Sequence, residues 1–155
     1  MISYSVATTD EDYATARNLF VEYADLIYVN LCFQKFDDEL NSLSKMYARP
    51  LGGILLVKEN EHFIGCAGVR KINENIGELK RMYINPAYQK KGIGKHLLNQ
   101  ALELAIECNY KKIRLDTLNN MFAAIHLYKK AGFYEIAPYY SNPIEATVYL
   151  ERSLI

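Results

Sequence analysis

The middle of the chain holds one long amphipathic helix between two strand-like segments, and this pattern narrows the possible folds more than any other. The helix spans residues 93–108, because apolar side chains recur there every three or four positions. Its apolar face carries Ile93, Leu97, Ala101, Leu104, Ala105 and Cys108. Segments 77–84 and 112–117 read as strands. A strand, a helix and a strand within about forty residues predict a βαβ unit with parallel strands.

The other segments predict an α/β domain that extends around this unit. Residues 1–155 fit a single domain, because this length is enough for one well-buried core. Further strands are expected at 2–8, 54–58, 62–71, 133–136 and 146–151, and further helices at 10–27, 36–46 and 120–131. Gly132 is placed to end the last of these helices in the left-handed conformation. The expected total is about seven strands and about four helices.

Charge and cysteine content exclude several classes of protein. The 18 basic and 18 acidic residues balance, so no global field attracts nucleic acid or an anionic membrane. The three cysteines are widely spaced, which argues against a disulfide framework and against a zinc site, and the sequence predicts no bound metal. Acids near the N-terminus and the lack of a long apolar run predict a cytoplasmic protein. Both a monomer and a homodimer are compatible with the sequence.

The charges are nevertheless distributed unevenly. Residues 1–61 hold ten acids and five bases, which would suit a cationic amine as a ligand. No acid lies between Leu79 and Leu102, where five lysines and arginines fall. The segment Gln89-Lys90-Lys91-Gly92-Ile93-Gly94-Lys95 lies in this stretch, just before the long helix. Its glycines and the helix start would present several N–H groups to an anion, and a pyrophosphate is the natural guest.

The glycine segment is also compatible with other interpretations. It could be a turn that serves packing alone, since glycine pairs are common between strands and helices. A P-loop would need Ser or Thr after Lys95, where His96 stands. A dinucleotide fingerprint would need a third glycine at Leu97.

The segment instead resembles the pyrophosphate loop of the GNAT acyltransferase superfamily, whose form is Q/R-x-x-G-x-G/A. The stretch from Glu78 to Pro86 looks like the strand before that loop, and residues 127–133 look like the family's L-Y-x-x-x-G-F signature. Together these motifs cover roughly residues 53–136. The resemblance implies a twisted, mixed, mostly antiparallel sheet whose parallel core splays between its fourth and fifth strands. It also implies acetyl-CoA as the acyl donor.

The resemblance assigns roles to particular residues. The loop from Gln89 through Lys90, Lys91, Gly92, Ile93 and Gly94 to Lys95 would bind the pyrophosphate. Backbone groups of Met82, Tyr83 and Ile84 would hold the pantetheine arm. Many members carry an asparagine where this chain has Met121, so Asn119 or Asn120 is left as a cofactor contact or as the helix cap. We name Asn120 as the contact.

Three residues are candidates for the chemistry. Tyr128 matches the tyrosine that protonates the departing thiolate, although its helical spacing also fits a core position. Glu78 is the first candidate for the base that deprotonates the amine, and Asp116 is the second. Strict alternation would place Glu78 on one face with Lys80, Met82 and Ile84, where it could pair with the lysine unless a bulge re-aims it.

Acceptor recognition is expected from the first helices and the late loop, at Phe33, Gln34, Tyr139 and Tyr140. These residues are equally compatible with core and turn positions. The resulting prediction is an acetyl-CoA-dependent N-acetyltransferase that acts on a primary amine of a small molecule. The alternatives are transfer to a protein or peptide, and a non-catalytic acyl-CoA-binding domain.

Overall fold

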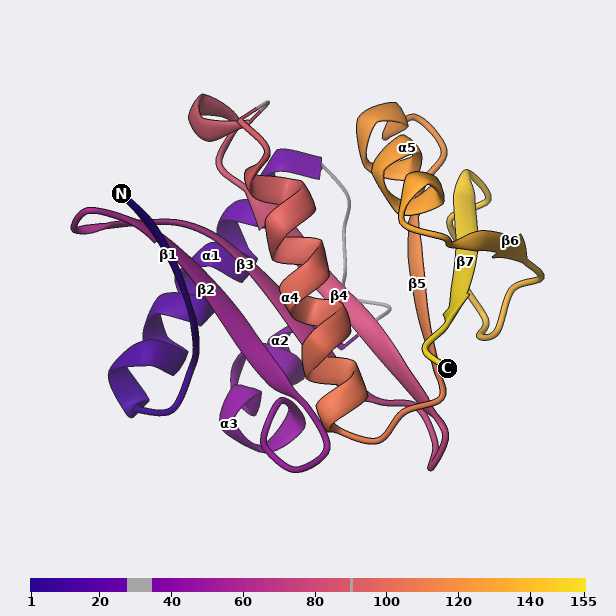
Figure 1. Cartoon of the computed structure of the whole chain (residues 1–155), viewed down its shortest axis with the longest axis horizontal. Coiled ribbons are helices and arrows are strands. Elements are labelled where there is room, and N and C mark those ends of the chain that lie inside the picture. The colour runs from indigo at the N-terminus through magenta and orange to yellow at the C-terminus, as the bar shows by residue number, and fades with distance from the viewer. Residues whose placement is uncertain (28–34, 90) are drawn as a thin grey trace.

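The computed structural model describes residues 1–27, 35–89 and 91–155 of the chain (Figure 1). Its elements in chain order are β1 (Ile2–Val6), α1 (Asp10–Ile27), α2 (Phe36–Leu40), α3 (Leu43–Met46), β2 (Gly53–Glu59), β3 (His62–Lys71), β4 (Ile76–Ile84), the 3₁₀ helix η2 (Pro86–Tyr88), α4 (Ile93–Glu107), β5 (Lys112–Leu118), α5 (Phe122–Lys130), β6 (Tyr134–Ile136) and β7 (Thr147–Ser153). None of the helices in these described ranges is long and apolar enough to cross a membrane.

The strands form one seven-stranded sheet in the order β1-β2-β3-β4-β5-β7-β6. Neighbouring strands pair antiparallel except β4 and β5, which pair parallel and are connected through α4. This arrangement confirms the predicted mixed, mostly antiparallel sheet and its parallel βαβ core. The β3–β4 turn is tight, because backbone bonds between Asn73 and Ile76 close it.

Two apolar cores cover the two faces of the sheet. On one face, buried side chains of α4 such as Leu97 and Ala101 pack with strand residues including Leu55 and Val69, and Tyr128 of α5 joins them. On the other face, Phe20 of α1 and Tyr47 after α3 belong to a second cluster. Figure 1 shows α4 across one face of β2–β4 while α1 and α2 lie behind the sheet. Side chains of β4 therefore point alternately into two different environments.

Most predicted boundaries agree with the structure, and one predicted helix does not. Residues 36–46 form the two short helices α2 and α3 rather than one helix. The chain turns between them at Asn41 and Ser42, which brings the total to five α-helices among the described residues. Gly132 has a φ of 100°, so it ends α5 in the left-handed conformation as predicted.

Candidate active site

The strands β4 and β5 part in the middle of the sheet. They pair only where Ile76, Gly77 and Glu78 lie beside residues 112–114. Beyond Glu78, these two fully described strands share no ladder bonds, so the edge of β4 that faces β5 is open. We call this opening the splay. The start of α4 and the helix α5 meet above it, because a Cβ on Gly94 would lie 3.6 Å from a Leu127 methyl group.

A β-bulge in β4 lies beside the splay. The register against β3 shifts between Cys66 and Gly68, and Arg81 on the opposite strand takes a φ of 55°. A non-glycine residue rarely adopts this left-handed backbone, so the surrounding structure must hold it there. The bulge adds one residue to β4 and changes the phase of every side chain after it.

The predicted strict alternation along β4 is wrong, because the bulge shifts the side chains that follow it to the opposite faces. Strict alternation placed Met82 and Ile84 on the same face as Glu78, but both pack against the α4 core. Tyr83 instead belongs to the cluster under α1. The predicted Glu78–Lys80 pairing is also not what holds the glutamate, because its carboxylate bonds to other residues.

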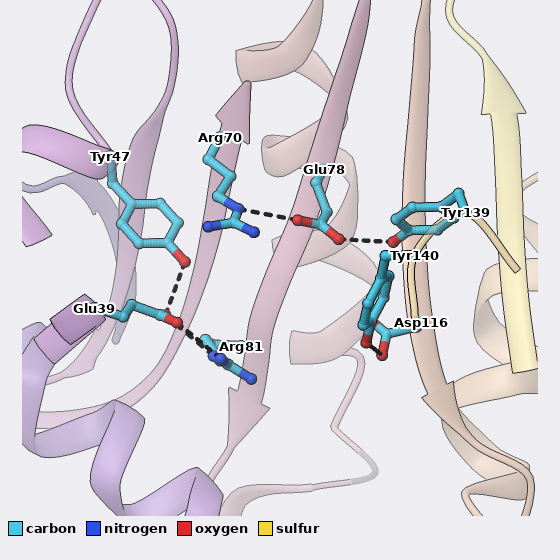
Figure 2. Close-up of polar contacts among 8 residues, drawn as sticks. All are labelled: Glu39, Tyr47, Arg70, Glu78, Arg81, Asp116, Tyr139 and Tyr140. Atoms are coloured by element: carbon cyan, nitrogen blue, oxygen red, sulfur yellow. Dashed lines mark hydrogen bonds and ion pairs between the residues drawn. The ribbon is translucent and has the colours of Figure 1, made fainter. Parts of the chain in front are cut away.

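Glu78 is almost fully buried and is held from two sides (Figure 2). One carboxylate oxygen accepts a hydrogen bond from Arg70 Nε at 2.9 Å, and the other accepts from the Tyr139 hydroxyl at 2.7 Å. Arg70 lies directly opposite Glu78 in the β3–β4 register. A charged hydrogen bond on each oxygen fixes the carboxylate at the narrow end of the splay.

Asp116 lies on β5 across the splay. Its Oδ2 accepts a hydrogen bond from the Tyr140 hydroxyl at 2.6 Å, and that hydroxyl accepts one from Asn142 Nδ2 at 3.0 Å. Burial raises the pKa of both Tyr139 and Tyr140, so both phenols stay protonated donors at neutral pH. Adjacent residues of one loop thus reach β4 and β5 respectively (Figure 2).

Tyr128 is buried on α5, with its ring edge-on to Phe133 at 5.7 Å between centroids. Burial raises its pKa, and the negative charge of Asp116 acts in the same direction. The phenol is therefore neutral near pH 7 and can supply a proton.

A small cavity of about 40 Å³ opens within the splay, which is room for a few water molecules. Its walls come from α1, β4, β5 and the late loop that continues into β7. The lining residues are Tyr23, Ile27, Leu79, Lys80, Arg81, Asp116, Thr117, Leu118, Asn142, Ile144 and Thr147. Of these segments, α1 and the late loop lie far from the glycine segment in the sequence.

The glycine segment has the geometry of an anion site. Gly92 is the N-cap of α4 with a φ of 76°, and no side chain caps the helix there. A Cβ on Gly92 would meet nothing within 4 Å, so the space before the helix is open. The first intrahelical bond runs from His96 N to Gly92 O, which leaves the preceding N–H groups outside the helical ladder. These features fit a phosphate group at this position.

Other members of the segment have structural roles of their own. The side-chain amide of Gln89 donates to the Ile84 carbonyl at 2.9 Å and so ties the loop to the end of β4. The Lys91 ammonium lies 5.6 Å from the centre of the Tyr88 ring. Lys90, like Phe33 and Gln34, lies outside the described residues.

One expectation near α5 is wrong. The helix begins at Phe122 with Met121 as its N-cap, so neither Asn119 nor Asn120 is the cap. Both asparagines lie in the exposed turn between β5 and α5. The role of Asn120 as a cofactor contact stays a prediction.

Sequence reasoning also missed two charged partners. Arg70 was detectable, because a tight turn around residue 74 sets the β3–β4 register and places Arg70 opposite Glu78. Glu39 gave no such signal. It binds Arg81, which lies 42 residues further along the chain, through Nε at 3.1 Å and Nη2 at 2.8 Å.

Comparison with known proteins identifies the family. The profile of the acetyltransferase (GNAT) family matches residues 13–133, so the chain belongs to this family and is an acyltransferase. An uncharacterized N-acetyltransferase of Schizosaccharomyces pombe is 34% identical over 156 residues, which cover 99% of this chain and 95% of that protein. Human N-acetylaspartate synthetase is 31% identical over 97 residues, which cover 61% of this chain and 32% of that protein.

Solved structures share the fold at low sequence identity. An acetyltransferase from Streptococcus agalactiae superposes with a TM-score of 0.81 at 17% identity, covering 98% of each chain. A GNAT acetyltransferase from Elizabethkingia anophelis with acetyl-CoA bound has a TM-score of 0.66 at 22% identity, covering 98% of this chain and 97% of that one. The ribosomal-protein-S18-alanine N-acetyltransferase of Escherichia coli has a TM-score of 0.73 at 18% identity, covering 99% and 94%.

Proposed function

We propose that this acetyltransferase moves an acetyl group from acetyl-CoA to a primary amine of a small molecule, by direct attack in a ternary complex. The observation that carries the proposal is the splay itself, an open strand edge on β4 that ends next to the uncapped start of α4. A donor with a long arm and a pyrophosphate would need these two features together. The acetyl-CoA-bound relative of similar fold supports the same donor.

The loop that begins α4 would hold the pyrophosphate. Gly92 supplies the left-handed turn and leaves open space in front of the first N–H groups of the helix. The helix start also carries a positive partial charge, which favours an anion there. Lys91 and Lys95 add cationic side chains to the same segment. Gln89 contributes by fixing the loop to the end of β4.

The open edge of β4 would hold the donor's arm. Backbone groups of Met82, Tyr83 and Ile84 lie after the bulge, on the part of β4 that does not pair with β5. A backbone N–H in this segment would donate to the carbonyl oxygen on which negative charge develops during attack. The donor supplies an activated thioester, so the protein needs mainly to orient it and to manage two protons.

We assign those protons to Tyr128 and Glu78. The amine nitrogen attacks the acetyl carbon, the carbon–sulfur bond breaks, and the buried Tyr128 hydroxyl protonates the departing sulfur. Glu78 accepts the proton that the amine loses. Because Tyr139 covers one oxygen of Glu78, the proton would pass through that hydroxyl or the amine would displace it. Asp116 is the second candidate for this base, since it lines the cavity directly.

The small cavity supports a small acceptor over a protein side chain. The names of the relatives point to both kinds of acceptor, because one is an N-acetylaspartate synthetase and another a ribosomal-protein-S18-alanine N-acetyltransferase. A turnover screen that reads thiol release with acetyl-CoA and panels of amines, polyamines, amino acids and peptides would decide between them. Turnover with peptides alone would reject the small-molecule proposal.

A binding test isolates the donor site. Gly92→Asp and Gly92→Asn both tolerate the left-handed backbone about equally well, and they differ only in charge. We expect the aspartate variant to bind acetyl-CoA at least roughly tenfold more weakly than the asparagine variant, about 1.4 kcal/mol, because its carboxylate would face the pyrophosphate. Equal affinities in calorimetry would remove the pyrophosphate from this loop.

A further inference from the structure

Charged side chains of both signs line the cavity in the splay, among the residues that the structure describes. Its charged lining residues are Lys80 and Arg81 of β4, which face Asp116 of β5. The other lining side chains in the described ranges are uncharged and include polar groups such as Asn142. Two cations on one side and a carboxylate on the other would complement a molecule that carries both charges.

Arg81 is held in a fixed orientation by its surroundings. Glu39 binds two of its three guanidinium nitrogens, and the Tyr47 hydroxyl donates to the same carboxylate at 2.9 Å. The ring of Phe36 covers the guanidinium at 5.2 Å. Figure 2 shows the remaining nitrogen pointing away from Glu39. A guanidinium that is already ordered can bind an anion with little further loss of side-chain freedom.

Lys80 adds a second cation beside it. Burial lowers the pKa of Lys80 and the charge of Arg81 lowers it further, while Glu78 acts in the opposite direction. A buried ammonium next to a guanidinium is stabilised by an anion that enters the same space.

We propose that the acceptor carries an anionic group close to its amine, as a small amino carboxylic acid does. Lys80 and Arg81 would bind its carboxylate, and its amine would then face Asp116 across the splay. This inference rests on the proposed N-acetyltransferase function and narrows its substrate class. It differs from the expectation that the acid-rich first 61 residues suit a cationic amine; one acid of that region, Glu39, is bound by Arg81.

The test compares matched acceptors that share an amine and differ in the acid group. Glycine and glycinamide, β-alanine and β-alaninamide, and L-methionine and L-methioninamide form such pairs, and thiol release from acetyl-CoA reports turnover. An enzyme indifferent to the carboxylate would favour the amides, since their amines are less basic and more of each is unprotonated. We expect kcat/KM to be roughly tenfold or more higher for the acid in the preferred pair.

A lysine variant then localises the effect. Lys80→Met should raise KM for the preferred acid by roughly tenfold or more and leave its amide within about twofold. Lys112→Met is the matched control, because Lys112 lies half-exposed on β5 outside the cavity, and it should change neither substrate. Unchanged acetyl-CoA affinity of Lys80→Met in calorimetry would show that the donor site is intact.

The outcomes separate this inference from the function on which it rests. Amides that react as well as acids in every pair would overturn it, and so would an acid preference that survives in Lys80→Met. Turnover confined to polyamines or peptides would overturn it while leaving the acetyltransferase function in place. Failure to bind acetyl-CoA at all would reject the proposed function itself, and the inference with it.

Discussion

The buried ion pair between Glu39 and Arg81 gives the most quantitative prediction. Their side chains are 2% and 4% exposed, and the pair joins α2 to the bulge of β4. Burial opposes ionisation of Glu39, but the hydrogen bonds and charge of Arg81 outweigh it and lower its pKa. Glu39→Gln would keep the shape of the side chain and remove its charge, which leaves a buried guanidinium without its anion.

The size of the effect follows from that burial. Removing one partner of a buried pair typically destabilises a protein by about 3–5 kcal/mol. The glutamine can still accept from Tyr47 and from one arginine nitrogen, so we expect about 3 kcal/mol. For a chain of this length that corresponds to a fall in Tm of roughly 6–12 °C.

Urea unfolding at pH 7, followed by circular dichroism, would measure the change in the free energy of unfolding. Glu107→Gln is the matched control, because Glu107 pairs with Arg49 at 2.8 Å but both side chains are about half exposed. That variant should lose no more than about 1 kcal/mol. If the two variants lose similar amounts of unfolding free energy, the Glu39 carboxylate is effectively solvated and the buried pair does not have the predicted effect.

Three further predictions concern catalysis and pH. Tyr128→Phe should lower kcat by roughly tenfold or more with little change in the acetyl-CoA KM, because the hydroxyl acts on charge that develops in the transition state. If this variant keeps wild-type turnover from about pH 6 to 9, Tyr128 serves packing only. Glu78→Gln should lower the turnover rate at neutral pH, and the rate should recover as rising pH supplies free amine, whereas Asp116→Asn should keep the wild-type pH–rate profile. If the two variants exchange these profiles, Asp116 is the base. The folded-state pKa of Glu39 is lowered, so its ionised form stabilises the fold above about pH 4.5, and this stabilisation is lost as the pH falls below that value. Glu39→Gln should therefore lose less stability than the wild type between pH 5 and 3 in urea unfolding. Parallel stability curves for the two proteins would contradict this.

Local patterns in the sequence were enough to predict most of the elements and the tight glycine turn before α4. Apolar periodicity identified α4 and the strands on either side of it, because helical and extended backbones repeat over different numbers of residues. Gly132 marked a left-handed position where a side chain would be strained, and Gly92 marked a tight turn. Both signals depend only on residues near each other in the chain, so no knowledge of the fold was needed to read them.

The side-chain contacts around the splay depended on the tertiary structure. The bulge at Arg81 decides which side chains of β4 face the splay, and nothing in the local pattern of that strand reveals an inserted residue. Glu39 reaches Arg81 across 42 residues, and Tyr139 reaches Glu78 across 61. Such contacts are set by the path of the whole chain around the sheet, whereas side-chain periodicity records only whether a residue is buried. The charges that surround the cavity therefore became visible only once distant segments were brought together.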